Sequence, residues 1–195
     1  MIKRYLFFSV LVGVLYNCAL FREGLQAPKS GTIEVTKPAS KTLSINVSGI
    51  VVENGGNPQS MQSMFLKPWQ DVSLEEGKAS SLFTSVVSGE PKSDFILDLE
   101  VKEDSSANIA LALITGLTLY LFPSSASAEI TLKGTFKKAG KEVGTVIRKE
   151  KVTFWQQILL IFVLPFKFPG NVMNDIRHDM VFDIYKEANQ KAFFK

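Results

Sequence analysis

The stretch "DFILDLEVKE", residues 94–103, decides the fold class, because every second residue in it is a large apolar one. Phe95, Leu97, Leu99 and Val101 are spaced to fall on one side of an extended chain. Two of the three residues between them, Asp98 and Glu100, are charged, and the charged Lys102 follows. A period of two over eight residues predicts a β-strand that buries one face and exposes the other.

Two further segments show the same strand signal. The stretch "TLSINVSGIVV", residues 42–52, alternates apolar with polar residues and is followed by the turn signal "ENGGNP" at 53–58. The stretch "AEITLKGTFKKAGKEVGTVIRKEKVTF", residues 128–154, predicts a β-hairpin that turns near Ala139 and Gly140. Together these segments predict an antiparallel sheet.

Helical patterns lie between and after these strands. A short helix is expected around 61–66, ending before Pro68. Ser73 and Glu76 have the Ser-x-x-Glu spacing of a capping box, and apolar residues at helical spacing continue to residue 87, before Gly89. A last helix is expected over 170–193, with an apolar stripe from Val172 to Ala188.

The resulting fold prediction is α+β. We expect a mainly antiparallel sheet of about four to five strands with two main helices packed on one face, and two apolar segments that flank the hairpin. A chain of 195 residues fits one domain of ordinary size. Its apolar fraction of 46% and charged fraction of 21% exclude a disordered chain and a polytopic membrane protein.

The first 18 residues, "MIKRYLFFSVLVGVLYNC", have the parts of a secretory signal. Lys3 and Arg4 precede the uncharged stretch from Tyr5 to Tyr16, which would form about 18 Å of helix against a hydrocarbon core of about 30 Å. A signal peptide therefore fits better than a transmembrane helix. The alternative is an uncleaved signal anchor in which Cys18, the sole cysteine of the chain, is incidental.

The end of this leader resembles the lipobox of bacterial lipoproteins. Leu15 matches the aliphatic residue at position −3, and Cys18 matches the invariant cysteine at +1. Tyr16 and Asn17 replace the usual small residues, as in spirochaete-type lipoboxes. The resemblance implies lipidation of Cys18, with diacylglycerol on the thiol and a further acyl chain, such as palmitate, on the new amino terminus. Two or more acyl chains hold a protein stably on a membrane, whereas one does so only marginally.

This resemblance sets the expected organisation and location. Residues 1–17 would be a cleaved signal peptide, 18–41 the lipidated cysteine and a tether rich in Pro, Gly, Ser and Lys, and 42–195 a single domain. A short strand is expected near 32–36. The protein would be anchored in the bacterial cell envelope on its periplasmic side. Ala19 at position +2 favours the outer membrane, with the inner membrane as the alternative.

Two apolar segments, 107–122 and 154–166, have three interpretations. They are buried core, they contact a membrane surface, or they insert as two transmembrane helices. Their aromatic residues and one lysine are the types that settle at a lipid interface. The candidate membrane-contact residues are Tyr120, Phe122, Phe154, Trp155, Phe166, Lys167 and Phe168.

The insertion hypothesis makes the protein an integral inner-membrane subunit of a transport or sensing assembly, with spans near 107–122 and 154–168. Residues 129–151 between these segments carry seven basic and three acidic residues, a net charge of +4 that would suit a cytoplasmic loop. The sequence "GLTLYLFP", followed by the hairpin and "TFWQQILLIFVLPF", is also similar to a set of small uncharacterised bacterial lipoproteins. That similarity implies no activity.

Few residues in the sequence suggest a catalytic or metal-binding site. His178 is the only histidine, which leaves no material for a Ser-His-Asp triad or a multi-histidine metal site, and we interpret it as part of a solvated helix face. We expect no catalytic residue, metal ligand or cofactor. The net charge of +3 falls to +1 without the leader's two basic residues, so we expect no nucleic-acid partner. The prediction is a non-enzymatic, lipid-anchored binding or accessory module, with membrane lipid and an envelope protein as partners.

Overall fold

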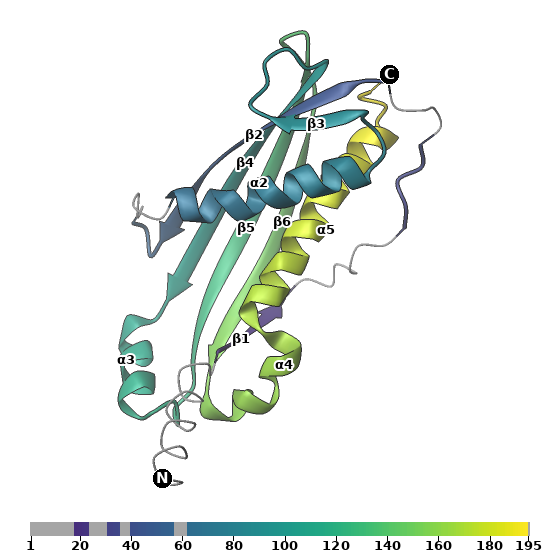
Figure 1. The fold of residues 1–195 in the computed structure, drawn as a ribbon. Coiled ribbons are helices and arrows are strands. Elements are labelled where there is room, and N and C mark those ends of the chain that lie inside the picture. The colour runs from purple at the N-terminus through teal and green to yellow at the C-terminus, as the bar shows by residue number, and fades with distance from the viewer. Residues whose placement is uncertain (1–17, 24–30, 36–39, 57–61, 195) are drawn as a thin grey trace, which may run out of the picture. The chain divides into compact units, whose positions relative to one another are not determined.

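The computed structural model describes residues 18–23, 31–35, 40–56 and 62–194, and its fold is mixed α+β (Figure 1). The chain divides into two compact units, each assembled from three separated segments. Unit 1 lies within Met1–Leu25, Ser105–Ala128 and Lys151–Asn174, and unit 2 within Gln26–Asp104, Glu129–Glu150 and Asp175–Lys195. The predicted signal peptide, residues 1–17, lies outside the described residues.

Six strands of the described chain form one sheet in the order β1-β6-β5-β4-β2-β3. The strands are β1 (Cys18–Arg22), β2 (Thr42–Glu53), β3 (Ser85–Ser88), β4 (Phe95–Ala107), β5 (Ser124–Lys138) and β6 (Lys141–Gln156). The helices are α2 (Gln62–Ala79), α3 (Ile109–Leu117), the 3-10 helix η2 (Ile158–Phe162), α4 (Leu164–Lys167) and α5 (Pro169–Gln190).

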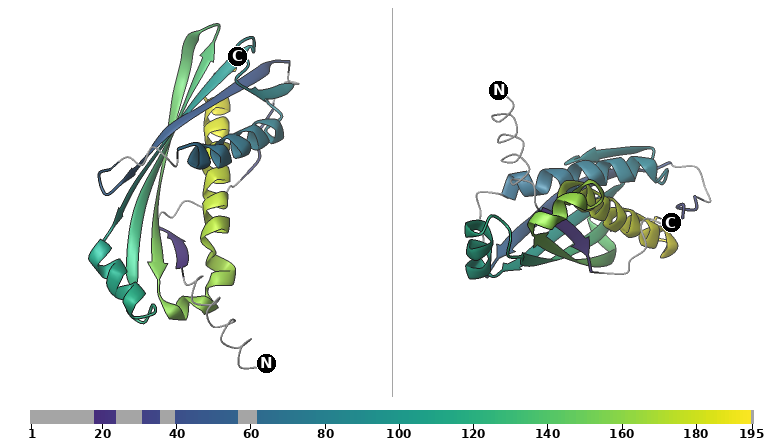
Figure 2. Two further views of the ribbon diagram at one scale, coloured as in Figure 1. Left: turned by 60° about the vertical axis from the view of Figure 1, so that its left-hand side comes forward. Right: turned by 90° about the horizontal axis from the view of Figure 1, so that it is seen from below.

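Strand β4 contains most of the alternating stretch 94–103, and the predicted alternation is confirmed. Phe95, Leu97, Leu99 and Val101 are all buried. They form the middle of the apolar face of unit 2, which α2 and the unit 2 part of α5 cover (Figure 2). The prediction of two helices on one face of a sheet therefore holds within this unit.

The sheet has more strands and more parallel pairing than the sequence predicts. β3 was not expected, and it pairs with β2 in parallel, with Thr42 opposite Ser85. The side-chain hydrogen bonds Thr42–Asp94 and Asn46–Asp98 advance together along β2 and β4, so these two strands are also parallel. Parallel neighbours need a crossover connection. Helix α2 provides it.

The boundaries predicted for α2 are wrong. The structure has one continuous helix with Pro68 inside it, instead of a short helix before Pro68 and a second helix capped by Ser73 and Glu76. The proline removes one backbone hydrogen bond. The burial of Trp69 on the same helix offsets the stability lost with that bond. The Ser73 hydroxyl donates to the Trp69 carbonyl at 2.6 Å, a bond made inside a helix rather than at its start.

The hairpin and the last helix agree with the sequence. β5 and β6 are joined by Ala139 and Gly140, with φ of 50° and 77°, the two positive values of a type I′ turn. In α5, Ile176, Ile184 and Ala188 of the predicted stripe are fully buried. The Tyr185 hydroxyl on the same helix donates to the Ser73 carbonyl at 3.1 Å, which ties α5 to α2.

Candidate functional site

Strand β1 fixes the position of Cys18 in unit 1. Residues 18–22, expected in a tether, pair antiparallel with the end of β6, with Cys18 opposite Gln156 and Arg22 opposite Val152. The Glu23 amide extends the pairing by donating to the Lys151 carbonyl at 2.8 Å, and their side chains form an ion pair at 2.7 Å. Cys18 therefore begins a paired strand of the sheet.

Helices η2 and α4 follow β6 directly and pack against β1. Several of their large side chains nevertheless point into solvent. Phe162 is 78% exposed and Phe166 is 81% exposed, and Leu159 and Phe168 are exposed as well. The apolar run after Gln156 is thus a broken helical segment beside the Cys18 strand, and none of its side chains whose exposure is described is buried.

Helix α3 presents a second exposed apolar face in the same unit. The Asn108 side chain caps it by accepting a hydrogen bond from the Leu111 amide at 3.0 Å. Ile109, Leu113 and Leu117, one turn apart from each other, are 71%, 63% and 77% exposed. Such a stripe normally packs against a core. Here it faces outward.

The turn after α3 joins the two apolar segments and is strained. Leu119 and Tyr120 have φ of 51° and 63°, a left-handed conformation that disfavours side chains larger than glycine. The Tyr120 amide donates to the Thr115 carbonyl at 2.8 Å, and the Ile158 amide of η2 donates to the Tyr120 carbonyl at 2.9 Å. Backbone strain held in place by such bonds is common at functional sites.

We define the apolar surface as the exposed large apolar side chains of unit 1. Eighteen large apolar side chains of the described residues are exposed, and thirteen of them belong to this unit. The five in unit 2 are valines and isoleucines on strands or in the 31–35 segment. The apolar surface consists of Ile109, Leu111, Leu113, Ile114, Leu117, Leu119, Leu121, Phe122, Trp155, Leu159, Phe162, Phe166 and Phe168.

The residues selected from the sequence as membrane contacts fall in this region, with different exposure. Phe122, Trp155, Phe166, Lys167 and Phe168 are exposed. Tyr120 and Phe154 are half-buried. The aliphatic residues of α3 were not selected individually, although the uncharged run from 105 to 128 was the signal that contained them.

The two segments do not have the form of transmembrane helices. α3 has nine residues and a length of about 14 Å, roughly half of a bilayer core. The stretch 154–168 is divided among the end of β6, η2 and α4. Among the described residues, no helix combines the length and apolar character needed to cross a membrane. The hypothesis of two spans is therefore not favoured.

The basic hairpin is also largely neutralised. Five of its seven basic side chains form ion pairs, several with acids far away in the sequence. On β6, Arg148 pairs with Asp183 and Glu187 of α5. The remaining pairs are Lys133–Glu100, Lys137–Asp98, Lys149–Glu129 and Lys151–Glu23. The +4 of the local sequence does not describe the folded surface.

Two candidate chemical groups have structural environments. Burial raises the pKa of the Cys18 thiol above its usual value, which disfavours the reactive thiolate at neutral pH. His178 is not part of a solvated face: its side chain is 22% exposed and its Nδ1 lies 2.7 Å from Oε1 of the buried Glu76. Within the described parts of the chain, no group of three metal-binding side chains is placed to hold a metal ion.

Comparison with known proteins gives distant structural likenesses only. No protein-family model and no curated protein sequence matches the chain. A neuraminyllactose-binding hemagglutinin homologue from Helicobacter pylori is similar in structure, with 13% identity, a TM-score of 0.48, and coverage of 87% of this chain and 95% of that one.

Two further structures are similar. A DUF330 protein from Xanthomonas campestris has 12% identity, a TM-score of 0.43, and coverage of 85% of this chain and 97% of its own. A minor lipoprotein from Acinetobacter baumannii has 12% identity, a TM-score of 0.34, and coverage of 80% and 90%. Likenesses at this level assign neither a family nor an activity to this chain.

The strained turn gives a stability prediction. Leu119→Gly removes a side chain from a left-handed residue, and we expect the free energy of unfolding to stay unchanged or to rise by up to about 1 kcal/mol. Leu113→Gly, at an equally exposed position inside α3, should lower it by roughly 1 kcal/mol. Urea denaturation monitored by circular dichroism measures both. Equal losses in the two variants would contradict the strained turn.

Proposed function

We propose that this protein is a lipid-anchored lipoprotein of the bacterial cell envelope that seats unit 1 on the membrane holding its acylated Cys18. In this role it is a non-enzymatic binding or accessory module that presents a surface to an envelope protein partner. The observation that carries the proposal is the gathering of the apolar surface in the unit that contains Cys18. Ala19 at position +2 favours the outer membrane as the site.

Exposed apolar area on this scale is costly in water. Burying a large apolar side chain stabilises by about 1.5–3 kcal/mol, so even partial insertion of the apolar surface would contribute on the order of 10 kcal/mol before ordering costs. A contiguous exposed apolar patch normally marks a protein or membrane contact. Because acyl chains on Cys18 would already hold the chain at a bilayer, insertion would cost little additional translational entropy.

The local chemistry supports lipid as the occupant. Unit 1 has no charged residue between 105 and 128. Trp155 lies at the end of β6 and Lys167 between two exposed phenylalanines, Phe166 and Phe168. Aromatic rings and single lysines are enriched where apolar side chains meet lipid headgroups. Lys167 is the only charged residue among these contact residues, which is too little charge for an electrostatic anchor. The contact should therefore be mainly apolar.

Acylation is tested by metabolic labelling. Radiolabelled palmitate should enter the wild-type protein expressed in a bacterial host with lipoprotein processing, and it should not enter Cys18→Ser. Mass spectrometry of the mature amino terminus locates the modification. Absent labelling, or equal labelling of the two proteins, would contradict the lipoprotein proposal.

The membrane contact is tested without the acyl chains. Secreted through a conventional cleaved signal, Cys18→Ser should still float with phospholipid vesicles, with little dependence on salt. Adding Phe162→Ser and Phe166→Ser should weaken vesicle binding about 10-fold or more, because each removes an apolar side chain from the contact.

The matched control carries Ile50→Ser and Ile147→Ser, which remove exposed apolar side chains from unit 2. This control should bind vesicles as tightly as the parent. All these positions are exposed, so circular dichroism should show unchanged folding. Equal loss in both double variants, or loss in neither, would contradict the contact by unit 1.

A further inference from the structure

Helix α3 of unit 1 is exposed on almost every side. It connects β4 to β5 (Figure 1). Eight of its nine residues are exposed, and only Thr115 is buried. The exposed residues include Ala110 and Ala112 as well as the five large side chains of this helix that belong to the apolar surface. The exposure of α3 is therefore not confined to the single stripe described above.

Helix α3 also has no polar face. Thr115 is its only residue with a polar side chain, and the Thr115 hydroxyl donates to the Leu111 carbonyl of the same helix at 2.9 Å. The nearest charged residues in the sequence are Asp104 and Glu129. A helix that lies flat in a membrane interface combines an apolar face with a strongly polar one. α3 does not match that pattern, because its exposed surface is apolar all round.

The backbone groups at both ends of α3 are satisfied by the chain itself. At the N-terminal end, Asn108 accepts two hydrogen bonds from amides of the helix, one through its side chain and one through its carbonyl. At the C-terminal end, three carbonyls of α3 accept hydrogen bonds from the amides of Thr118, Leu119 and Tyr120. The left-handed conformation of Leu119 and Tyr120 turns their amides back onto these carbonyls. Hydrocarbon offers no hydrogen-bond partners, so a helix in lipid has to satisfy its own backbone groups in this way.

We propose that α3 inserts whole into the acyl-chain region of one membrane leaflet, so that lipid surrounds it on every side. This inference rests on the membrane contact of unit 1 proposed above, and it adds the depth and the surroundings of one helix. The helix is about 14 Å long and about 10 Å across, and one leaflet contributes about 15 Å of hydrocarbon. α3 therefore fits within one leaflet in any orientation.

The exposure pattern favours lipid over a protein as the occupant. A protein groove holds a helix by one apolar face, with anchors at positions i, i+3, i+4 and i+7, and leaves the opposite face to solvent. On α3 such a groove would leave apolar side chains in water. Acyl chains cover all sides of a helix at once and need no matching shape. The uncharged residues from 105 to 128 on both sides of α3 are compatible with the same surroundings.

Site-directed spin labelling tests the surroundings of each side of α3. Because Cys18 is the only cysteine, the Cys18→Ser protein secreted through a conventional cleaved signal can carry one nitroxide on one introduced cysteine. Labels are placed in turn at the eight exposed positions of α3, and Ile50→Cys and Ile147→Cys in unit 2 serve as controls. Power saturation compares how often each nitroxide meets oxygen, which concentrates in hydrocarbon, and an aqueous nickel chelate.

On phosphatidylcholine vesicles, all eight α3 labels should meet oxygen more than the nickel chelate, without a period of about 3.6 residues along the helix. The control labels should stay accessible to the nickel chelate. The inference is overturned if the oxygen preference rises and falls with the helical period, as in a helix that lies flat at the interface. It is equally overturned if the α3 labels stay accessible to nickel on bound vesicles.

Two charge variants of the same Cys18→Ser protein give a second readout. Ala110→Asp and Ala112→Asp lie about 200° apart around α3, on nearly opposite sides. Each places a carboxylate among acyl chains and should weaken binding to phosphatidylcholine vesicles at least 10-fold. A flat helix would tolerate one of the two. Ile147→Asp adds the same charge in unit 2 and should leave vesicle binding unchanged, and circular dichroism should show unchanged folding for all three variants.

The outcomes separate the insertion of α3 from the membrane contact of unit 1. If the parent protein does not bind vesicles, the membrane contact fails and the insertion fails with it. If Phe162→Ser with Phe166→Ser weakens vesicle binding while Ala110→Asp or Ala112→Asp does not, the membrane contact stands and only the insertion of α3 is contradicted.

Discussion

Backbone pairing between β1 and the last residues of β6 is the constraint on which the account of unit 1 depends. It sets Cys18 opposite Gln156, and the exposed 3-10 helix η2 begins two residues later. The hydrogen bond from the Ile158 amide to the Tyr120 carbonyl then joins η2 to the turn after α3. Through these backbone contacts the proposed acylation site, η2 and α3 belong to one compact unit.

The contrast in side-chain exposure between the units has a physical meaning. Unit 2 covers its apolar sheet face with α2 and its part of α5, and it holds only five of the eighteen exposed large apolar side chains of the described residues. Unit 1 buries strand residues such as Ala19, Leu20 and Val152. It nevertheless exposes the leucines of α3 and the phenylalanines of η2 and α4. An amphipathic helix contacts a bilayer in this way, with its apolar side chains in the acyl boundary.

The sequence predicts periodic elements well and long-range relations poorly. The alternation in β4, the turn at Ala139–Gly140 and the stripe of α5 are local patterns, and the structure confirms them. The Ser73–Glu76 pattern fails because helix interiors produce the same spacing. The apolar composition of residues 107–122 alone does not predict whether their side chains are buried by other parts of the protein. The acids that neutralise the hairpin, such as Asp183 and Glu187, lie about 40 residues away in the sequence.

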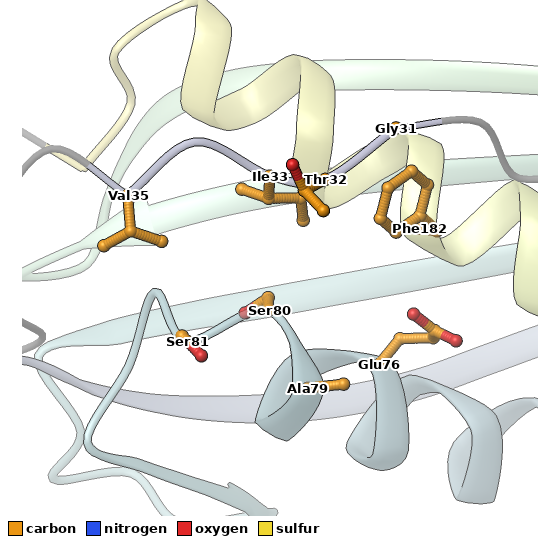
Figure 3. A pocket seen from close by; sticks show the side chains of 9 residues that line it. All are labelled: Gly31, Thr32, Ile33, Val35, Glu76, Ala79, Ser80, Ser81 and Phe182. Atoms are coloured by element: carbon orange, nitrogen blue, oxygen red, sulfur yellow. The ribbon is translucent and has the colours of Figure 1, made fainter.

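The contact between Glu76 and His178 illustrates the same limit. Ser73 and Glu76 attract attention as a cap, while His178 has the surroundings of a solvated helix residue in the sequence. Only the crossover through α2 brings Glu76 against α5 and beneath the segment 31–35 (Figure 3). That juxtaposition joins residues more than 100 positions apart, and no local pattern contains it.

The central claim, that unit 1 rests in a lipid interface, is tested most directly by the fluorescence of Trp155. The chain has two tryptophans, Trp69 in the core of unit 2 and Trp155, which is 42% exposed, in the apolar surface. In a Trp69→Phe protein bound to vesicles, phospholipids with brominated acyl chains should quench Trp155, and aqueous acrylamide should lose access to it. Trp155 fluorescence that brominated lipid leaves unchanged, and that acrylamide quenches as in free protein, would contradict the claim.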